Sequence, residues 1–240
     1  VKNLDNLKKV IDNGRLARLP GMGERKVDII ARGIAIFSPD GYRGRLLLGT
    51  ALPLVEEIIQ SLREKLSIKR CIYGLNKIRI IPAGSLRRMQ ETIGDLDILA
   101  TGDSYREIIE IFTRLPQVKE ILAAGTTKAS VLLSSASGGD HQVDLRVVEP
   151  DSFGAALLYF TGSKAHNIKL RGLAKSQGLK INASGLFSGA KKIAGLTEEE
   201  IYRTMGLPWI PPELREDRGE IELARKNKLP ALIQYNDIKG

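Results

Sequence analysis

The chain of 240 residues is long enough to form one or two domains around a hydrophobic core, and 42% of its residues are hydrophobic. No apolar run approaches the ~20 residues of a membrane span, and the first residues lack the apolar core of a signal peptide, so we expect a soluble, intracellular protein. One cysteine and two histidines exclude an intrachain disulfide and a Cys/His zinc site, and the net charge of +9 favours a polyanionic partner.

The excess of basic residues is confined to the two ends of the chain. The formal net charge is +6 for residues 1–75, −1 for residues 76–150 and +4 for residues 151–240. Basic flanks that hold phosphates, around a centre that holds cations, would produce this distribution.

In chain order, the first predicted elements are a helix, a turn and a second helix within residues 3–34. Apolar residues recur at helical spacing on both sides of the turn, and Gly14 ends the first helix. The turn LPGMGERK suits a helix-hairpin-helix, in which backbone N–H groups beside a helix N-terminus hold a DNA phosphate without reading its base. The candidate DNA-binding residues there are Gly21, Gly23, Arg25 and Lys26. An ordinary corner between two helices is the alternative.

The centre of the chain is predicted to be an α/β or α+β layer. A long amphipathic helix over residues 52–66 precedes a strand that begins at Lys77 and runs into a turn. A second strand at 95–100, a helix at 105–115 and a hairpin of strands 129–134 and 141–148 follow. Helices that cross strands, with a hairpin at the end, indicate this layered class.

From Phe153 onward the chain is predicted to be mostly helical. Ser163 is a good N-cap and Gly178 a good stop, so residues 164–177 are expected to form one helix. An irregular Pro-rich segment at 206–217 and a short helix near 220–228 complete the chain. Cys71 is interpreted as a packing residue. His166 is interpreted as a structural residue or a phosphate contact, and Trp209 as a packing anchor rather than a base-stacking platform.

Three aspartates form the first candidate site. Side chains alternate along a strand, so Asp95 and Asp97 point the same way while Leu96 points into the core. Neighbouring carboxylates repel each other, and a bound divalent cation removes that conflict. In the later strand Asp144 and Arg146 share one face, so a third carboxylate can complete a site that suits Mg²⁺ in phosphoryl transfer. For Asp-x-Asp alone, a solvent-facing strand is the alternative.

The surrounding residues favour a phosphate ligand. Gly84, Ser85 and Gly94 allow the backbone to approach a phosphate, and Arg87 and Arg88 supply guanidinium groups that suit phosphate oxygens. Further along, one face of the helix at 164–177 carries Lys164, Asn167 and Arg171. That face could meet a base and the minor groove of a nascent pair, or it could be a solvated basic face.

The segments GSLRRMQETIGDLD, VDLRV and YFTGSKAHN, in this order behind the helix-turn-helix, resemble the family X DNA polymerases, the DNA polymerase beta group of the nucleotidyltransferase superfamily. The similarity is greatest to the bacterial and archaeal members. It implies three parts: a helix-hairpin-helix, fingers-type domain at 1–50, a catalytic palm at 51–150 and a nucleotide-binding, thumb-type domain at 151–240.

The resemblance also implies roles for single residues and for cofactors. Two Mg²⁺ ions, which Mn²⁺ can replace, would be bound by the catalytic residues Asp95, Asp97 and Asp144. The implied nucleotide contacts are Gly84, Ser85, Arg88, Gly94, Tyr159, Phe160, Gly162 and Asn167, with a cis peptide at Gly162–Ser163. The implied DNA contacts are Arg171 and the hairpin of Gly21 and Gly23, where a monovalent cation can bind. Lys164, on the same helix face as Arg171, and Arg146, beside Asp144, are further candidate DNA contacts.

Two positions depart from the eukaryotic pattern. Met89 stands where those members have Gly after the arginine pair, and Gln142 stands where they have a basic residue two positions before the third aspartate.

Bacterial members usually carry a lyase-like domain and a histidine-rich PHP domain as well. Neither is expected in this chain, so we expect neither 3′→5′ exonuclease nor abasic-site lyase activity from it.

The expected function is that of a DNA-directed DNA polymerase that fills short gaps in base excision and other DNA repair. Its expected partners are gapped or primer-template DNA and a deoxynucleoside triphosphate, acting as a monomer without a membrane, in the cytoplasm of a bacterium or archaeon at the nucleoid. Two alternatives are a template-independent nucleotidyltransferase and a DNA-binding scaffold whose active site is idle.

Overall fold

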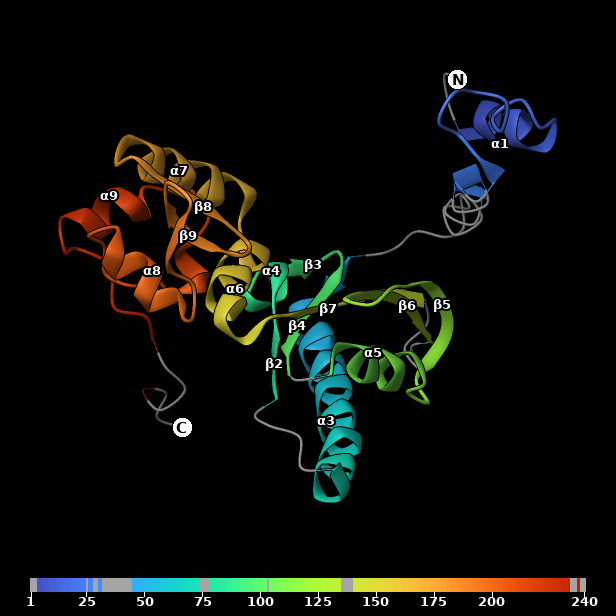
Figure 1. Ribbon diagram of the computed structural model, residues 1–240, viewed down its shortest axis with the longest axis horizontal. Helices are drawn as coiled ribbons and strands as arrows, with labels where there is room; N and C mark the ends of the chain where they lie inside the picture. The colour runs from blue at the N-terminus through green and yellow to red at the C-terminus, as the bar shows by residue number, and fades with distance from the viewer. Residues whose placement is uncertain are drawn as a thin grey trace. The chain divides into compact units, whose positions relative to one another are not determined.

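The structure is a computed structural model that describes residues 4–24, 26–27, 30–31, 45–73, 78–102, 104–134, 140–233 and 237. The chain divides into two compact units, residues 1–44 and residues 45–240 (Figure 1). The finer division of the second unit at residue 150 stays a prediction.

The first unit begins with helix α1, Leu4–Asp12. Gly14 follows with a φ of +67°, a left-handed conformation that suits glycine and ends the helix as expected. Helical structure resumes at Glu24 and includes residues 26, 27, 30 and 31. The predicted helix, turn and helix are therefore confirmed as far as this part of the chain is described, and Arg25 lies outside the described residues.

The second unit is built on a five-stranded sheet with the order β2-β4-β7-β6-β5. The strands are β2 Arg79–Pro82, β4 Leu96–Thr101, β5 Val118–Ala124, β6 Lys128–Ser134 and β7 Asp140–Val148. β4 and β7 are parallel, and the other neighbours are antiparallel. A separate two-stranded sheet pairs β1 Leu46–Leu47 with β3 Thr92–Ile93. The predicted strands are confirmed, whereas β5 was not predicted because most of its residues are exposed and its register shifts twice.

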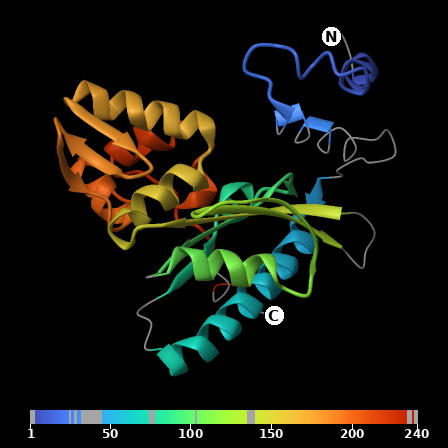
Figure 2. The same ribbon diagram turned by 45° about the vertical axis from the view of Figure 1, so that its right-hand side comes forward.

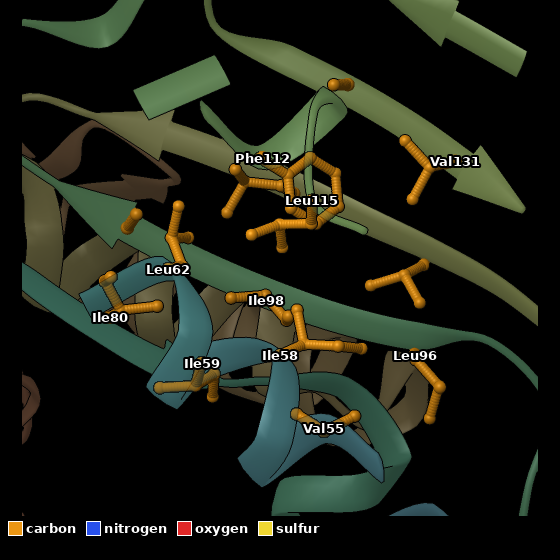
Figure 3. Packing of buried hydrophobic residues seen from close by; sticks show 14 of the residues in the cluster. Val55, Ile58, Ile59, Leu62, Ile80, Leu96, Ile98, Phe112, Leu115 and Val131 are labelled. Carbon is orange, nitrogen blue, oxygen red and sulfur yellow. The ribbon is translucent and has the colours of Figure 1, made fainter. Parts of the chain in front are cut away.

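Helices α3, Leu48–Tyr73, and α5, Tyr105–Thr113, cover one face of this sheet (Figure 2). Figure 3 shows Val55, Ile58 and Leu62 of α3 packed toward Ile98 of β4 and Phe112 of α5. The apolar positions of the helices and the alternate residues of the strands thus bury each other, which accounts for the predicted long helix. The side chain of Cys71, near the end of α3, lies outside the described residues.

Helix α6, Phe153–Thr161, covers the opposite face, where Leu99 of β4 is buried with Phe153 and Leu157. A cis peptide bond joins Gly162 to Ser163, as expected. Helix α7, Lys164–Ser176, then begins at Ser163, whose side chain accepts a hydrogen bond from the His166 backbone N–H. The prediction of this helix from its cap and stop residues is confirmed.

The remaining chain forms a second, smaller sheet and short helices. The elements are β8 Leu179–Asn182, β9 Gly185–Ser188, β10 Lys191–Ala194, α8 Glu198–Thr204 and α9 Glu220–Arg225. Single 3-10 turns lie at Pro150–Ser152 and Pro212–Leu214. The expectation of a mostly helical segment missed this three-stranded antiparallel sheet, because strands of four residues are too short to display a clear alternation. Among the described residues, no helix is long and apolar enough to cross a membrane.

Candidate active site

Asp97 and Asp144 lie side by side on neighbouring parallel strands, where they are direct register partners. Their neighbours Ile98 and Leu145 are buried in the core formed with α3 and α5, so both carboxylates occupy the opposite face of the sheet. Asp95 lies just before β4 and is exposed. The structure therefore brings the three predicted carboxylates to one region of the sheet.

The proximity of these carboxylates changes their protonation. Burial, followed by the charges of Asp144 and Asp95, raises the pKa of Asp97 to about 6. Burial of Asp144 acts in the same direction, but hydrogen bonds from Lys128, Gln142 and Ser130 outweigh it, so the pKa of Asp144 lies below its usual value. The site thus contains one carboxylate, Asp97, whose protonated form is favoured by burial and nearby negative charge, and one, Asp144, whose ionised form is stabilised by internal donors.

The donors to Asp144 determine how the site fits a metal ion. Lys128 Nζ lies 2.7 Å from Asp144 Oδ2, and Gln142 Nε2 donates to Asp144 Oδ1 at 2.8 Å. In this arrangement, the described part of the chain contains no group of three His, Cys, Asp or Glu side chains placed to hold a metal ion. The donor chemistry nevertheless fits, since clustered carboxylate oxygens are the ligands that hard divalent cations prefer. Binding of one ion by all three aspartates would require their side chains to come closer together than they lie here, at a carboxylate, Asp144, that already accepts hydrogen bonds from Lys128 and Gln142.

A cavity of about 120 Å³ opens beside these carboxylates. Its lining includes Asp97, Asp144, Lys128, Arg146 and Phe160. The guanidinium carbon of Arg146 lies 4.5 Å from the centre of the Phe160 ring, a distance at which the cation and the aromatic face attract each other. Arg146, predicted to contact DNA, and Phe160, predicted to contact the nucleotide, therefore line the same space as the acidic pair.

The Gly84 backbone lies directly against Asp97. Gly84 has a φ of +61°, and a Cβ built on it would lie 2.3 Å from Asp97 Oδ2. The Ala83 N–H donates to the Asp97 carbonyl at 2.8 Å, which fixes this loop against β4. Gly84 and Ser85 then begin the short helix α4, Gly84–Arg87. The side chain that lies close to Gly84 is thus Asp97, and the backbone approach to a phosphate expected at Gly84 stays a prediction.

Gly94 is approached by a different partner. A Cβ at Gly94 would lie 3.3 Å from Arg45 Nη1, and the Arg45 guanidinium also donates to the side chain and carbonyl of Thr92. The space beside Gly94, predicted for a phosphate, is therefore next to a cation in the structure.

The two arginines after Ser85 have internal partners. Arg87 forms two hydrogen bonds of 2.8 Å with Glu198 of α8 and one of 2.7 Å with Thr161 Oγ1. Arg88 donates to Glu216 and to the Thr161 carbonyl. The expectation that both guanidinium groups face a phosphate differs from this structure, in which Arg87 joins α4 to the C-terminal elements.

Glu198 is the centre of a buried polar network that the sequence reasoning missed. It pairs with Arg87 and with the fully buried Arg215, and Trp209 Nε1 donates to it at 3.1 Å. Burial alone would raise the pKa of Glu198, but the hydrogen bonds from Arg87 and the charge of Arg215 lower it to about 2. Trp209 accordingly has a structural contact, although its side chain is partly exposed.

The predicted nucleotide and base contacts meet between α6 and α7. Asn167 Nδ2 donates to the Tyr159 carbonyl at 2.7 Å, and Arg171 Nε donates to the Asn167 carbonyl at 3.2 Å. Tyr159 is exposed and packs edge-on against Phe160. Lys164 and Arg171 are also exposed, so this helix face is free to meet another molecule.

His166 faces away from that surface. It is fully buried, and its ring nitrogens lie 2.6 Å from Glu220 Oε1 and 2.8 Å from the Tyr202 hydroxyl. Of its two interpretations, a structural residue or a phosphate contact, these contacts support the first. Gly162, predicted on the sugar side, is buried, and a Cβ there would lie 3.2 Å from Arg88 Nη1.

The two departures from the eukaryotic pattern have clear structural consequences. Met89 has a φ of +53°, a left-handed conformation that glycine adopts without strain, and its side chain is exposed. Gln142 is a neutral donor to Asp144. A cation still reaches this carboxylate, because Lys128 supplies it from the adjacent strand β6.

In the first unit, the hairpin glycines form an open turn. Gly21 has a φ of +79°, and a Cβ on Gly21 or Gly23 would meet no atom of the described residues within 4 Å. Lys26 Nζ donates to the Gly21 carbonyl at 2.8 Å across this turn, and the Lys26 side chain remains exposed. This backbone could accept a phosphate, as predicted, or could serve as a plain corner.

The known proteins to which this chain is similar are DNA polymerases. Residues 156–216 match the family described as DNA polymerase beta thumb. Along its whole length the chain is 36% identical to DNA polymerase/3'-5' exonuclease PolX of Bacillus subtilis, of which it spans 40%. It is 26% identical to Repair DNA polymerase X of African swine fever virus, over 67% of this chain and 95% of that protein. A ternary gap complex of Leishmania infantum polymerase beta has a similar fold, with a TM-score of 0.68 and 20% identity over 90% of this chain and 81% of that one.

Proposed function

We propose that this chain, which belongs to the family X DNA polymerases, joins a deoxynucleoside triphosphate to the 3′-hydroxyl of a DNA primer opposite a template. The observation that carries the proposal is the register pairing of Asp97 with Asp144 beside the Gly84 backbone. A fold that hosts many functions does not by itself identify one, so the site geometry must support the assignment.

Asp95, Asp97 and Asp144 are the residues that would hold two Mg²⁺ ions. When bound, these ions would supply activation of the primer hydroxyl and neutralisation of the triphosphate charge. The raised pKa of Asp97 supports this assignment, because a bound cation would offset the burial and the neighbouring negative charges that raise it. Asp144 is assigned to the primer side, and Asp95 and Asp97 to both ions.

The remaining residues position the substrates. The backbone at Gly84 and Ser85, with Arg88 released from Glu216, would bind the triphosphate. Tyr159 and Phe160 would pack against the sugar, next to the cavity that Phe160 and Arg146 line. These residues would hold the nucleotide phosphorus in line with the primer hydroxyl. Such alignment of the reacting atoms is the contribution of positioning to the rate.

The bound DNA would lie on basic surfaces. Exposed Lys164 and Arg171 on α7 would meet the nascent pair, and the Gly21 hairpin would hold a strand, with a monovalent cation. Short-gap filling in DNA repair is the proposed setting. The name of the viral relative, a repair polymerase, and the gap complex of the Leishmania protein support it.

The test is primer extension by the purified chain with Mg²⁺ or Mn²⁺ on gapped, recessed and single-stranded substrates. The proposal expects addition of the complementary nucleotide to templated primers, with a preference for the gap. Equal addition to primers without a template would indicate a template-independent nucleotidyltransferase instead. DNA binding without extension by either metal would indicate a scaffold.

A further inference from the structure

Lys128 occupies one oxygen of the Asp144 carboxylate. Its Nζ lies 2.7 Å from Asp144 Oδ2, and Gln142 holds the other oxygen, Oδ1. Ser130, directly opposite Asp144 across β6 and β7, adds a third hydrogen bond. Both oxygens of a carboxylate at the centre of the candidate site are therefore engaged within the protein.

Lys128 differs from the other two donors in charge and in reach. It is the cationic donor of the three, and its side chain is 43% exposed whereas that of Asp144 is 19% exposed. A lysine ammonium sits on a flexible four-carbon stem, so it can move into solvent while the strand stays in place. The backbone around it is anchored, since Val147 N–H donates to the Thr127 carbonyl and Gly125 N–H to the Lys128 carbonyl.

Arg146 is the other cation of this cavity, and it has a different partner. Lys128 and Arg146 are register partners on β6 and β7, so their side chains emerge from one face. The Arg146 guanidinium lies over the Phe160 ring, whereas Lys128 reaches diagonally to Asp144. The positive charges of Lys128 and Arg146 thus point to different partners. Lys128 is the one that balances the carboxylates of Asp97 and Asp144.

We propose that Lys128 is a resident counter-cation of Asp144, which a divalent cation must displace in order to bind there. The inference rests on the proposed function, because it assigns Asp144 to the metal site. Lys128 would then set the affinity of the site: it lowers the repulsion among the carboxylates when no metal is present, and it opposes metal binding through like charge and competition for Oδ2. Lys128 is thus a positioning residue that acts through Asp144.

The direct test is a titration of the metal-free full chain with Mn²⁺. The electron paramagnetic resonance signal of free Mn²⁺ measures how much of the metal is bound. Lys128→Met, which keeps the stem and removes the charge, is expected to bind Mn²⁺ more tightly, on the order of tenfold for a partly screened unit charge at the site. Lys128→Arg should stay close to the parent. Lys119→Met is the matched control, because Lys119 forms an ion pair of the same 2.7 Å with Asp140.

Thermal unfolding provides a second readout. In chelator, Lys128→Met should have a lower melting temperature than the parent, and added Mn²⁺ should raise its melting temperature by more. For Lys119→Met, added Mn²⁺ should raise the melting temperature by the same amount as for the parent. A lower melting temperature without tighter Mn²⁺ binding would mean that Lys128 only stabilises the strand pair, and the inference would be overturned. Weaker Mn²⁺ binding by Lys128→Met would overturn it as well.

Asp144→Asn separates this inference from the proposed function. If that variant loses the Mn²⁺ ion assigned to Asp144 while Lys128→Met binds like the parent, the metal site stands and the role of Lys128 is wrong. If Asp144→Asn binds like the parent, the cation sits elsewhere and both fail. If the parent binds no Mn²⁺, binding gained by Lys128→Met supports the inference, and none in either overturns both.

Discussion

Gly84 and Asp97 are in direct contact: a Cβ on Gly84 would lie 2.3 Å from Asp97 Oδ2. Asp97 is therefore positioned by the same backbone that is proposed to bind the triphosphate. This contact explains why a glycine precedes Ser85, since any larger residue would push the carboxylate out of its place in β4.

Gly84→Ala is expected to reduce single-turnover nucleotide insertion by at least an order of magnitude, because misplaced groups at a reacting centre cost about 100-fold per ångström. Gly189→Ala is the matched control. Gly189 has a similar φ of +57°, but a Cβ there would meet nothing within 4 Å in the part of the chain that the structure describes. Equal losses in the two variants would assign the effect to backbone strain, and the Asp97 contact would have no role.

Glu198→Gln is expected to destabilise the protein by about 3–5 kcal/mol, because it leaves the buried Arg215 without its countercharge. The measurement is urea unfolding of both proteins. Since the pKa of Glu198 is lowered from 4.5 to about 2, its contribution is present above pH 4.5 and is lost as the pH falls toward 2. The difference in the free energy of unfolding between variant and parent should therefore become smaller as the pH falls toward 2.

The control for that variant is Glu199→Gln, at the exposed neighbouring position. It should change the free energy of unfolding by less than about 0.5 kcal/mol. An equally small effect of Glu198→Gln would contradict the assignment of Glu198 as the centre of the network.

Asp97 gives the opposite pH dependence. Its pKa is raised from 3.8 to about 6, so the folded state binds this proton more tightly than the unfolded state does. The resulting stability is fully present below pH 3.8 and is lost as the pH rises through 6. In chelator, Asp97→Asn should therefore lose less stability over this interval than the parent, as measured by urea unfolding at each pH. Parallel curves for the two proteins would contradict the crowded carboxylate site.

Local patterns were sufficient to predict the acidic face and helix α7. The alternation of β4 and β7 placed Asp97 and Asp144 on one face, and the cap at Ser163 fixed the helix start, because both signals act over a few residues. The resemblance to a polymerase family, rather than spacing, supplied the roles of the single residues.

Contacts between distant segments could not be predicted in the same way. Arg87 and Glu198 are 111 residues apart, and nothing near Arg87 distinguishes a buried ion pair from a phosphate ligand. Lys128 reached Asp144 only through the antiparallel pairing of β6 with β7. The strands β8 to β10 were missed because each has only four residues.

DNA binding should depend on salt through the hairpin of the first unit. Lys26→Ala is expected to make the log–log slope of affinity against salt shallower by about 0.9, the value for one phosphate contact, without changing sequence preference. Lys9→Ala, an exposed lysine on α1, is the control and should leave the slope unchanged. An unchanged slope for Lys26→Ala would indicate that the turn is an ordinary corner between helices.

The different roles proposed for Asp95, Asp97 and Asp144 give the most direct test of the three-aspartate site. Nucleotide binding to gapped DNA complexes with Mg²⁺, followed by single-turnover extension, should be measured for the parent, Asp144→Asn and Asp97→Asn. Asp144→Asn should bind the nucleoside triphosphate like the parent and fail to join it, because the lost interaction belongs mainly to the transition state. Asp97→Asn should weaken both steps. Extension by Asp144→Asn at the parental rate would contradict the three-aspartate site and the polymerase mechanism built on it.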